Sequence, residues 1–476
     1  MRMNPAQTAF LEALRPVLGP KGIITDPALI APWEIDWRRR FSGHAPAIIA
    51  PADTGQVQAV LRAAVEHCVS LVPQGGNSSM VGGATPPADG SALILSTRRM
   101  NRIRRIDAGA GMVVAEAGVI LADLHAAAEA EGARFPLTLG AKGNATVGGL
   151  VSTNAGGTQV LRFGTMRGLT LGIEAVLPDG SLHDGLSALK KDNRGYDLGQ
   201  LLIGAEGTLG IVTAAALRLA PGIARSATAW VGLSDPGAGL TLLRRLQAAS
   251  DMIESFEILP AESLAAAIAH LPGARSPLEG AHPWHVLIEA VTGDAHADPT
   301  TMLETQLARA IEDGVVADAV IAASQAQSEA FWLLRHSLSD AERALGPAVQ
   351  HDIAVPVDAM PRFMVEAAAT CDARFPGTHA SGFGHLGDGN IHFHVRAAPG
   401  TDRDRFYAED AATITRFVHD LVTAAGGTIS AEHGIGQMKR DELARLSPER
   451  VAAIRAIKTA LDPHGLFNPG KLVACA

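Results

Sequence analysis

Two histidines flank a short turn in the second half of the chain, in the run GFGHLGDGNIHFH. Asp388-Gly389 between strand-like residues is a strong signal for a two-residue hairpin turn. A turn centred there pairs His385 with His392, and directly opposed side chains on one sheet face lie roughly 5 Å apart. His394, two residues further on, points to the same face. Two imidazoles held in this way suit a single metal ion.

A carboxylate that would complete a metal site occurs in SAEHGIG, where Glu432 precedes His433. Two His and one Glu with open positions are typical of catalytic Zn²⁺, Mn²⁺ or Fe²⁺. A lone strand histidine is more often structural, however, and Glu432 taken alone reads equally well as an ordinary turn carboxylate. The sequence alone does not show whether Glu432 lies near the hairpin. Its interpretation as a metal ligand and its interpretation as an ordinary turn carboxylate therefore both stay open at this point.

Three clusters rich in glycine and hydroxyl residues lie in the first half, at 73–83, 140–157 and 204–211. Consecutive glycines after a strand let backbone N–H groups converge on an anion. None is a P-loop, because no Gly-Lys-Ser/Thr follows. Any one of them alone is equally well a flexible turn. Three in one domain predict a large phosphate-bearing ligand that lies along the backbone.

The loops PQGGNSSMVGG, GNATVGGLVSTNAGG and GAEGTLGIVT resemble, in this order, the FAD-binding segments of the vanillyl-alcohol oxidase (PCMH-type) flavoproteins. Relatives that attach FAD covalently carry a histidine where this chain has Asn77, so the resemblance implies dissociable FAD. A C-terminal FNPGK segment resembles the one that returns to the flavin. The cofactor contacts implied are Pro73, Gly75, Gly76, Asn77, Ser78, Ser79, Gly82, Pro136, Gly140, Gly143, Thr146, Gly149, Ser152, Asn154, Gly156, Glu206, Ile211 and Asn468.

The motifs GHLGDGNIH and SAEHGIG resemble the paired signatures of FAD- and metal-dependent D-2-hydroxy acid dehydrogenases, which include D-lactate, D-2-hydroxyglutarate and glycolate dehydrogenases. This likeness implies His385, His392 and Glu432 as metal ligands, with Zn²⁺ expected first and Mn²⁺ or Fe²⁺ as alternatives. It implies His433 as the catalytic base and Arg335, in WLLR, as the residue that binds the substrate carboxylate. The reaction implied is oxidation of a D-2-hydroxy acid to the 2-oxo acid, with hydride transfer to flavin N5.

The expected substrate contacts depart from the hydroxyglutarate branch at two positions. Relatives of that branch usually have Lys where Gln350 stands and often Asn where His394 stands. Ser339, one turn after Arg335, keeps a hydroxyl donor on the same helical face. With His433, these residues are the predicted substrate contacts, and D-2-hydroxyglutarate and D-lactate both stay open as substrates.

Two other functions are consistent with the flavin loops. One is a glycolate oxidase-type subunit of a flavoprotein complex, and the other is a non-redox transferase of the alkyl-glycerone-phosphate synthase type, which carries a run of histidines absent here. The stretch 382–387 matches G-x-G-x-x-G, but a strand rather than a helix follows it, so NAD binding there is not expected. The expected electron acceptor is an electron-transfer flavoprotein or a quinone.

The elements that must position these residues fall into two predicted domains of an α+β fold. Residues 1–221 are expected to form a PCMH-type FAD-binding domain with an N-terminal helical extension. Residues 222–476 are expected to form a substrate- and metal-binding domain, with a ferredoxin-like antiparallel sheet and a C-terminal helical segment. The patterns predict helices at 54–68, 240–248, 299–312 and 448–461, and strands at 47–50, 71–73, 93–95, 112–115, 211–219, 229–233, 285–291 and 353–357.

Composition excludes several classes of protein. The chain has 476 residues, 47% of them hydrophobic, with a formal net charge of −9, which describes a globular protein without a nucleic-acid surface. It contains no apolar run of the ~18 residues needed to cross a membrane, and Glu12 and Arg15 interrupt the first apolar run, unlike a signal peptide. Cys68, Cys371 and Cys475 are far apart and predict reduced thiols of a cytoplasmic protein. A homodimer stays open.

Overall fold

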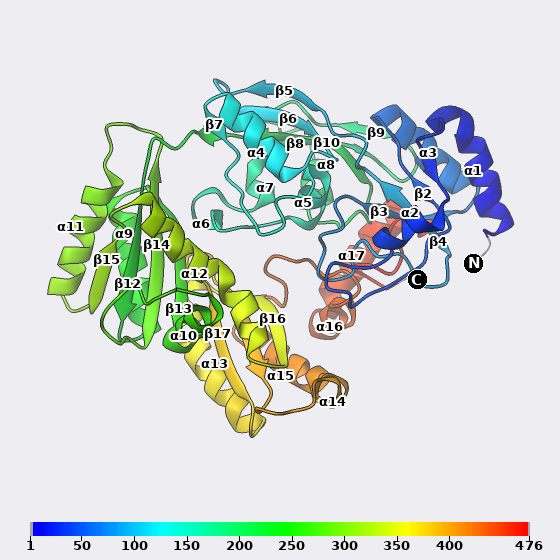
Figure 1. The fold of residues 1–476 in the computed structure, drawn as a ribbon. Helices are drawn as coiled ribbons and strands as arrows, with labels where there is room; N and C mark the ends of the chain where they lie inside the picture. The colour runs from blue at the N-terminus through cyan, green and yellow to red at the C-terminus, as the bar shows by residue number, and fades with distance from the viewer. Residues whose placement is uncertain (1–2, 475–476) are drawn as a thin grey trace. The chain divides into compact units, whose positions relative to one another are not determined.

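The computed structural model describes residues 3–474, which divide into two compact units (Figure 1). Within this range, unit 1 comprises residues 3–157, 163–222 and 432–474, and unit 2 comprises residues 158–162 and 223–431. The chain changes unit after Gly222 and returns to unit 1 at Glu432. Of the predicted second domain, 222–476, residues 223–431 lie in unit 2 and residues 432–474 pack with unit 1.

Residues 432–474, the returning segment, are held to the rest of unit 1 by backbone pairing. Leu71 and Phe467 form a parallel bridge, and the N–H of Asn468 donates to the carbonyl of Leu71 at 2.8 Å. Leu71 and Phe467 are both fully buried in one apolar cluster. In Figure 1 the red C-terminal segment accordingly lies beside β3 (Ser70–Gln74). Contacts between positions so far apart in the chain have no local sequence signal.

Unit 1 is built on two main sheets. The first, in the order β1-β2-β4-β3, runs through Ile23–Ile24, Ile48–Ile49, Ala92–Ser96 and Ser70–Gln74, with β2 and β3 both parallel to β4. The second, in the order β5-β6-β10-β8-β9, is antiparallel and runs through Ile103–Asp107, Met112–Glu116, Ile211–Arg218, Thr170–Val176 and Leu182–Asp184. A small pair joins β7 (Ala133–Arg134) to β11 (Ala220–Pro221).

The helices of unit 1 begin at residues suited to capping. Asn4 and Gln7 form a reciprocal capping box at α1, and Asp53 accepts from the N–H of Gln56 at α3. α3 ends two residues earlier than the predicted Cys68. The helices are α1 (Pro5–Leu18), α2 (Pro27–Ile30), a 3₁₀ turn (Ala31–Trp33), α3 (Thr54–Glu66), α4 (Leu121–Ala130), α5 (Val147–Thr153), α7 (Met166–Leu169), α8 (Leu198–Leu202), α16 (Arg440–Leu446) and α17 (Pro448–Leu461). α6 (Val160–Phe163) lies at the change of unit.

Unit 2 contains one antiparallel sheet of seven strands, which confirms the predicted antiparallel sheet. Its order is β15-β12-β14-β13-β17-β18-β16. The strands are β12 (Arg225–Leu233), β13 (Ile253–Pro260), β14 (Trp284–Thr292), β15 (Asp318–Ile321), β16 (Ala348–Ala354), β17 (His379–His385) and β18 (Asn390–Arg396). β16 ends at Ala354 rather than at the predicted Val357, because Pro356 cannot donate to a ladder and a 3₁₀ turn (Val357–Ala359) follows.

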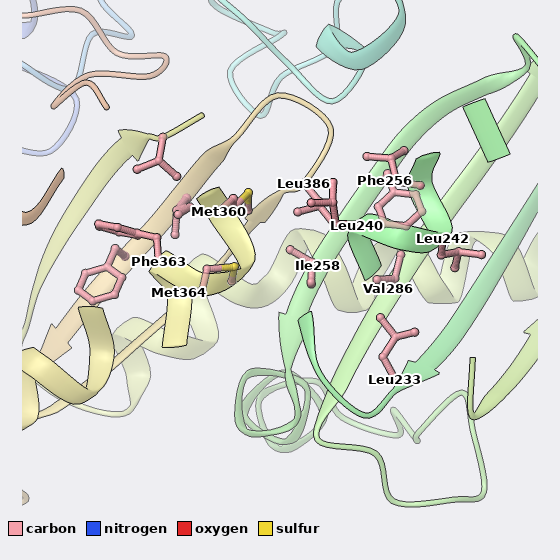
Figure 2. Close-up of a cluster of buried hydrophobic side chains, with 14 of the residues drawn as sticks. Leu233, Leu240, Leu242, Phe256, Ile258, Val286, Met360, Phe363, Met364 and Leu386 are labelled. Atoms are coloured by element: carbon pink, nitrogen blue, oxygen red, sulfur yellow. The ribbon is translucent and has the colours of Figure 1, made fainter. Parts of the chain in front are cut away.

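One face of this sheet is apolar and forms the main core of unit 2. Figure 2 shows Ile258 and Val286 of the sheet together with Leu240 and Leu242 of α9 (Pro236–Ala249) and with Met360 and Met364 of α13 (Met360–Arg374). The other helices of unit 2 are α10 (Ala261–His270), α11 (Pro299–Glu312), α12 (Gln325–Ala344), α14 (Arg403–Glu409) and α15 (Ala411–Ala424).

Helix α12 packs on the opposite face of the sheet. Phe331, Leu334 and Leu338 form a second apolar cluster with Trp230 and Phe383 of the sheet. Two charged residues, Arg335 and Glu342, are also buried on this helix. Because residues three, four and seven apart share one side of a helix, the same side of α12 delivers apolar contacts and two charges to the sheet.

The hairpin that carries the histidines has a different register from the predicted one. His385 is opposed to Asn390 rather than to His392, and the turn takes up the four residues 386–389. Leu386 is drawn out of the hairpin because its N–H donates to the carbonyl of Phe256 in β13 and its side chain is fully buried. The shift is by two residues, so the prediction that His385, His392 and His394 share one face still holds.

No helix within residues 3–474 is long and apolar enough to span a membrane. Cys68 is exposed and Cys371 is buried, and both are free thiols. Burial raises the pKa of Cys371 to about 12. Cys475 lies outside the described residues.

Candidate functional site

A row of polar side chains crosses one face of the unit 2 sheet on β13, β17, β18 and β16. Opposed residues of an antiparallel pair point to the same side of a sheet, and so do residues two apart on one strand. The strand pairing therefore places on this face Glu257, His385, His392, His394, Gln350 and Asp352. The sheet thus brings together four predicted site residues from two separate stretches of the chain.

The carboxylate of Glu257 lies at the centre of this face and is fully buried. Its Oε1 is hydrogen bonded to Nδ1 of His385 at 2.7 Å, and its Oε2 accepts from Nε of Arg335 at 2.8 Å. Nη2 of Arg335 lies 2.7 Å from the same oxygen. Burial alone would raise the pKa of Glu257, but the charges of Arg335 and His385 outweigh it and lower that pKa to about 2.

The rings of His385 and His392 have centroids 5.6 Å apart and planes at 78°. With Glu257 at Nδ1, Nε2 is the nitrogen through which His385 would bind a metal. A carboxylate behind one ring nitrogen is the usual support for a metal-binding histidine. The pair therefore fits two ligands of a metal site. Across residues 3–474, however, no three His, Cys, Asp or Glu side chains gather closely enough to hold an ion.

The remaining predicted substrate contacts are distributed over both units. Arg335 is buried on α12 and Ser339, one turn later, is exposed. Gln350 and His394 are opposed across β16 and β18. Glu432 and His433 begin the returning segment of unit 1. Their predicted roles as metal ligand and base stay predictions.

All of the predicted FAD contacts lie in unit 1, where the three glycine-rich loops pack against one another. A Cβ on Gly76 would lie 1.7 Å from the carbonyl oxygen of Asn144, and one on Gly75 would lie 2.2 Å from Oγ1 of Thr146. A Cβ on Gly207 would lie 2.8 Å from Cγ of Pro73. Only residues without a side chain permit these approaches.

The first loop has features that fit a diphosphate. Asn77 has a φ of 53°, and a left-handed residue in a turn can take part in a concave nest of backbone N–H groups for an anion. Oγ1 of Thr146 is buried and has no hydrogen-bond partner within the described chain. A buried hydroxyl of this kind normally has a partner, which a bound cofactor would supply. The oxygen of Ser79, in contrast, accepts from the N–H groups of Val81 and Gly83 and so closes the loop.

Several of the predicted FAD contacts instead use their side chains within unit 1. The carboxylate of Glu206 is buried and accepts from the N–H groups of Ile435 at 2.7 Å and Gly436 at 2.8 Å. The Nδ2 of Asn468 donates to the carbonyls of Gly83 and Glu206. Asn154 accepts from Thr165 and Arg167, and Ile211 lies in the apolar core.

The contacts of Glu206 tie the third glycine-rich loop to the segment that begins with Glu432 and His433. Burial raises the pKa of Glu206, and the two backbone N–H groups only partly oppose that rise. A Cβ on Gly434 would lie 2.9 Å from Oε1 of Glu206, and φ is 80° there. Gly434 of the SAEHGIG motif is therefore needed for the segment to approach this carboxylate.

Sequence reasoning missed Glu257 and Glu342, two of the buried carboxylates of the unit 2 site. Each has a weak signal. Glu257 is a charge inside the apolar strand run FEILP, and Glu342 follows Arg335 by two helical turns. A charge in an otherwise buried element is expected to have a buried partner.

Comparison with known proteins decides the family. Residues 45–185 match the FAD binding domain, and residues 224–472 match the FAD linked oxidases, C-terminal domain. The chain belongs to the FAD-linked oxidases. The predicted flavoprotein oxidoreductase with a FAD-binding domain is thereby confirmed.

Named relatives of this FAD-linked oxidase cover nearly all of the chain. It is 34% identical over 459 residues to the mitochondrial D-2-hydroxyglutarate dehydrogenase of Arabidopsis thaliana, covering 96% of this chain and 80% of the relative. It is 35% identical over 465 residues to the mitochondrial D-2-hydroxyglutarate dehydrogenase of Bos taurus, and the match covers 97% of this chain and 83% of the relative. Among solved structures, substrate-bound p-cresol methylhydroxylase matches with a TM-score of 0.75 at 15% identity, over 99% of this chain and 98% of that structure. This match shows a shared fold.

Replacing Gly76 with Ala tests the close approach of the first two FAD loops. The new Cβ would overlap the carbonyl of Asn144, and overpacking of this kind costs about 1–3 kcal/mol. We expect FAD affinity to fall roughly tenfold or more, measured as flavin absorbance per folded protein during dilution. Gly109→Ala is the matched control, because its Cβ would meet only an ordinary contact at 3.6 Å. Equal flavin retention in both variants would contradict the assignment of this loop.

Proposed function

We propose that this FAD-linked oxidase oxidises a D-2-hydroxy acid to the corresponding 2-oxo acid. The observation that carries the proposal is the buried arrangement of Arg335, Glu257 and His385 beside His392. It sets a guanidinium, suited to a carboxylate, next to two imidazoles, suited to a hydroxyl or a metal. The names of the relatives favour D-2-hydroxyglutarate as a substrate of this chain, and D-lactate is the second candidate.

Arg335 would bind and orient the substrate carboxylate. Glu257 holds its guanidinium from one side, while Nη2 has no well-aligned acceptor among the described residues. A planar guanidinium has donors enough for two carboxylates. Arg335 can thus keep its contact with Glu257 and still pair with the substrate.

His433 would accept the proton of the substrate hydroxyl as C2 is oxidised. FAD, when bound, supplies at N5 the acceptor for the C2 hydride. Glu206 holds the backbone directly after His433, at Ile435 and Gly436. It would limit the positions that the base can take, which matters because a general base must lie within hydrogen-bond reach of its proton.

We also propose that His385, His392 and Glu432 bind a divalent cation, with Zn²⁺ first and Mn²⁺ or Fe²⁺ as alternatives. Such an ion, when bound, lowers the pKa of a coordinated hydroxyl. The imidazole pair and the carboxylate of Glu257 behind His385 support this proposal. Glu432 enters it from the SAEHGIG motif alone. For the electron acceptor we propose an electron-transfer flavoprotein or a quinone.

Anaerobic addition of 2-hydroxy acids to the purified protein tests the reaction. We expect a D-2-hydroxy acid to bleach the flavin absorbance and the L-enantiomer to leave it nearly unchanged, because the base and the flavin take a proton and a hydride from fixed sides of C2. Stopped-flow absorbance with D- and L-forms of lactate and 2-hydroxyglutarate measures this. If none of the D-acids reduces the flavin, the proposed function is wrong.

Replacing His385 with Ala tests the metal. The variant should lose one ligand, so metal per FAD should fall well below the wild-type ratio while FAD stays bound. Elemental analysis and flavin absorbance on the same sample give both values. His379→Ala is the matched control, because His379 lies on the same strand but is exposed. Full turnover by metal-free protein would refute the metal proposal.

A further inference from the structure

A second buried carboxylate, Glu342, lies on the same side of α12 as Arg335 and is 2% exposed. Ser263 donates its hydroxyl to Oε1 at 3.0 Å, and the guanidinium of Arg396 is hydrogen bonded to Oε2. Nδ1 of His394 lies 3.8 Å from Oε2. Burial would raise the pKa of Glu342, but His394 and Arg396 lower it to about 2. Glu342 therefore carries a negative charge that these two side chains share.

His392, His394 and Arg396 form one row along β18, since residues two apart on a strand share a face. Each step in this row is roughly 7 Å along the strand. A substrate whose hydroxyl lies at His385 and His392 and whose chain follows β18 would place its far end at His394 and Arg396. The row gives this end of the site His394 and Arg396, and Glu342 lies against both. His379, opposed to Arg396 on the neighbouring strand, is hydrogen bonded to Glu262 instead.

The strand neighbours of His394 carry no charge that could pair with a charged substrate. Its strand neighbours are Ser381 on one side and Gln350 on the other, both uncharged. Its ring lies edge-on to Phe383, with centroids 5.6 Å apart at 83°. Neither neighbour replaces the pairing that Glu342 provides.

Arg396 has one further donor at this position. Its side chain is 18% exposed, and Nε is buried without an acceptor anywhere in the described part of the chain. Glu342 thus occupies one edge of the guanidinium. A carboxylate from a substrate would have to share Arg396 with an internal carboxylate that already lies there.

We propose that Glu342 determines substrate specificity by pairing with Arg396 beside His394. This inference rests on the proposed function and, of its two candidate substrates, selects D-lactate over the D-2-hydroxyglutarate that the names of the relatives favour. With its two basic groups paired internally, the far end of the site favours D-2-hydroxy monocarboxylic acids with a short uncharged side chain. A second carboxylate there is repelled by Glu342 and finds the guanidinium of Arg396 already engaged. Glu342 is a specificity residue and takes no part in the proton or hydride transfer.

The test compares D-lactate and D-2-hydroxybutyrate with D-malate and D-2-hydroxyglutarate as substrates of the FAD-loaded protein. The wild type should have the higher kcat/KM for the monocarboxylic acids. Glu342→Gln keeps the shape of the side chain and its contact with Ser263 but removes the charge. It should raise kcat/KM for the dicarboxylic acids by about tenfold, because one hydrogen bond to a charged group is made available. The change should appear mainly in KM.

Glu329→Gln on the same helix is the matched control, because Glu329 is exposed and should leave all four values unchanged. The inference is overturned if wild type prefers dicarboxylic acids, a result that does not depend on whether Glu342→Gln folds. It is also overturned if folded Glu342→Gln keeps the wild-type ratio. Absence of flavin reduction by all four acids would instead overturn the proposed function.

Discussion

The Glu257 carboxylate holds a guanidinium from a helix and an imidazole from a neighbouring strand, and the arrangement of the unit 2 site depends on this interaction. Glu257 is fully buried, so its charge is tolerable only because Arg335 and His385 are paired with it. Removing one partner of such a buried pair costs about 3–5 kcal/mol. The same contacts fix which nitrogen of His385 can face a ligand and which edge of Arg335 is occupied. One interaction thus orients the two residues proposed to meet the substrate or its metal.

A different kind of carboxylate organises unit 1. Glu206 is buried too, but its partners are backbone N–H groups, and its pKa is raised where that of Glu257 is lowered. The charges of Arg335 and His385 outweigh the effect of burial on the pKa of Glu257, whereas the two N–H groups and the more weakly acting Lys439 and Lys471 only partly offset it at Glu206. The contribution of Glu206 is to link two segments of unit 1 that lie far apart in the sequence. It joins the third glycine-rich loop, which is predicted to contact FAD, to the chain that follows His433.

Patterns of local origin were predictable from the sequence. The glycine-rich loops, the shared face of His385 and His392, and helices such as 448–461 follow from residue type and period. The exact hairpin register was not predictable, because Leu386 leaves the turn to pack in a core and to bond Phe256. Nor could the pattern identify Glu257 and Glu342, whose partners lie far along the chain. Their roles depend on a strand order that alternation alone does not determine.

Glu257→Gln tests the central claim most directly, with metal per FAD and the KM for a D-2-hydroxy acid measured on the same preparation. Glu254→Gln is the control, because Glu254 is a buried carboxylate on the same strand that pairs with Arg162 instead. Loss of a supporting carboxylate typically weakens metal binding about 10- to 100-fold. The account predicts that Glu257→Gln loses metal and raises KM while FAD stays bound, and that Glu254→Gln does neither. Wild-type metal content and KM in folded Glu257→Gln would contradict it.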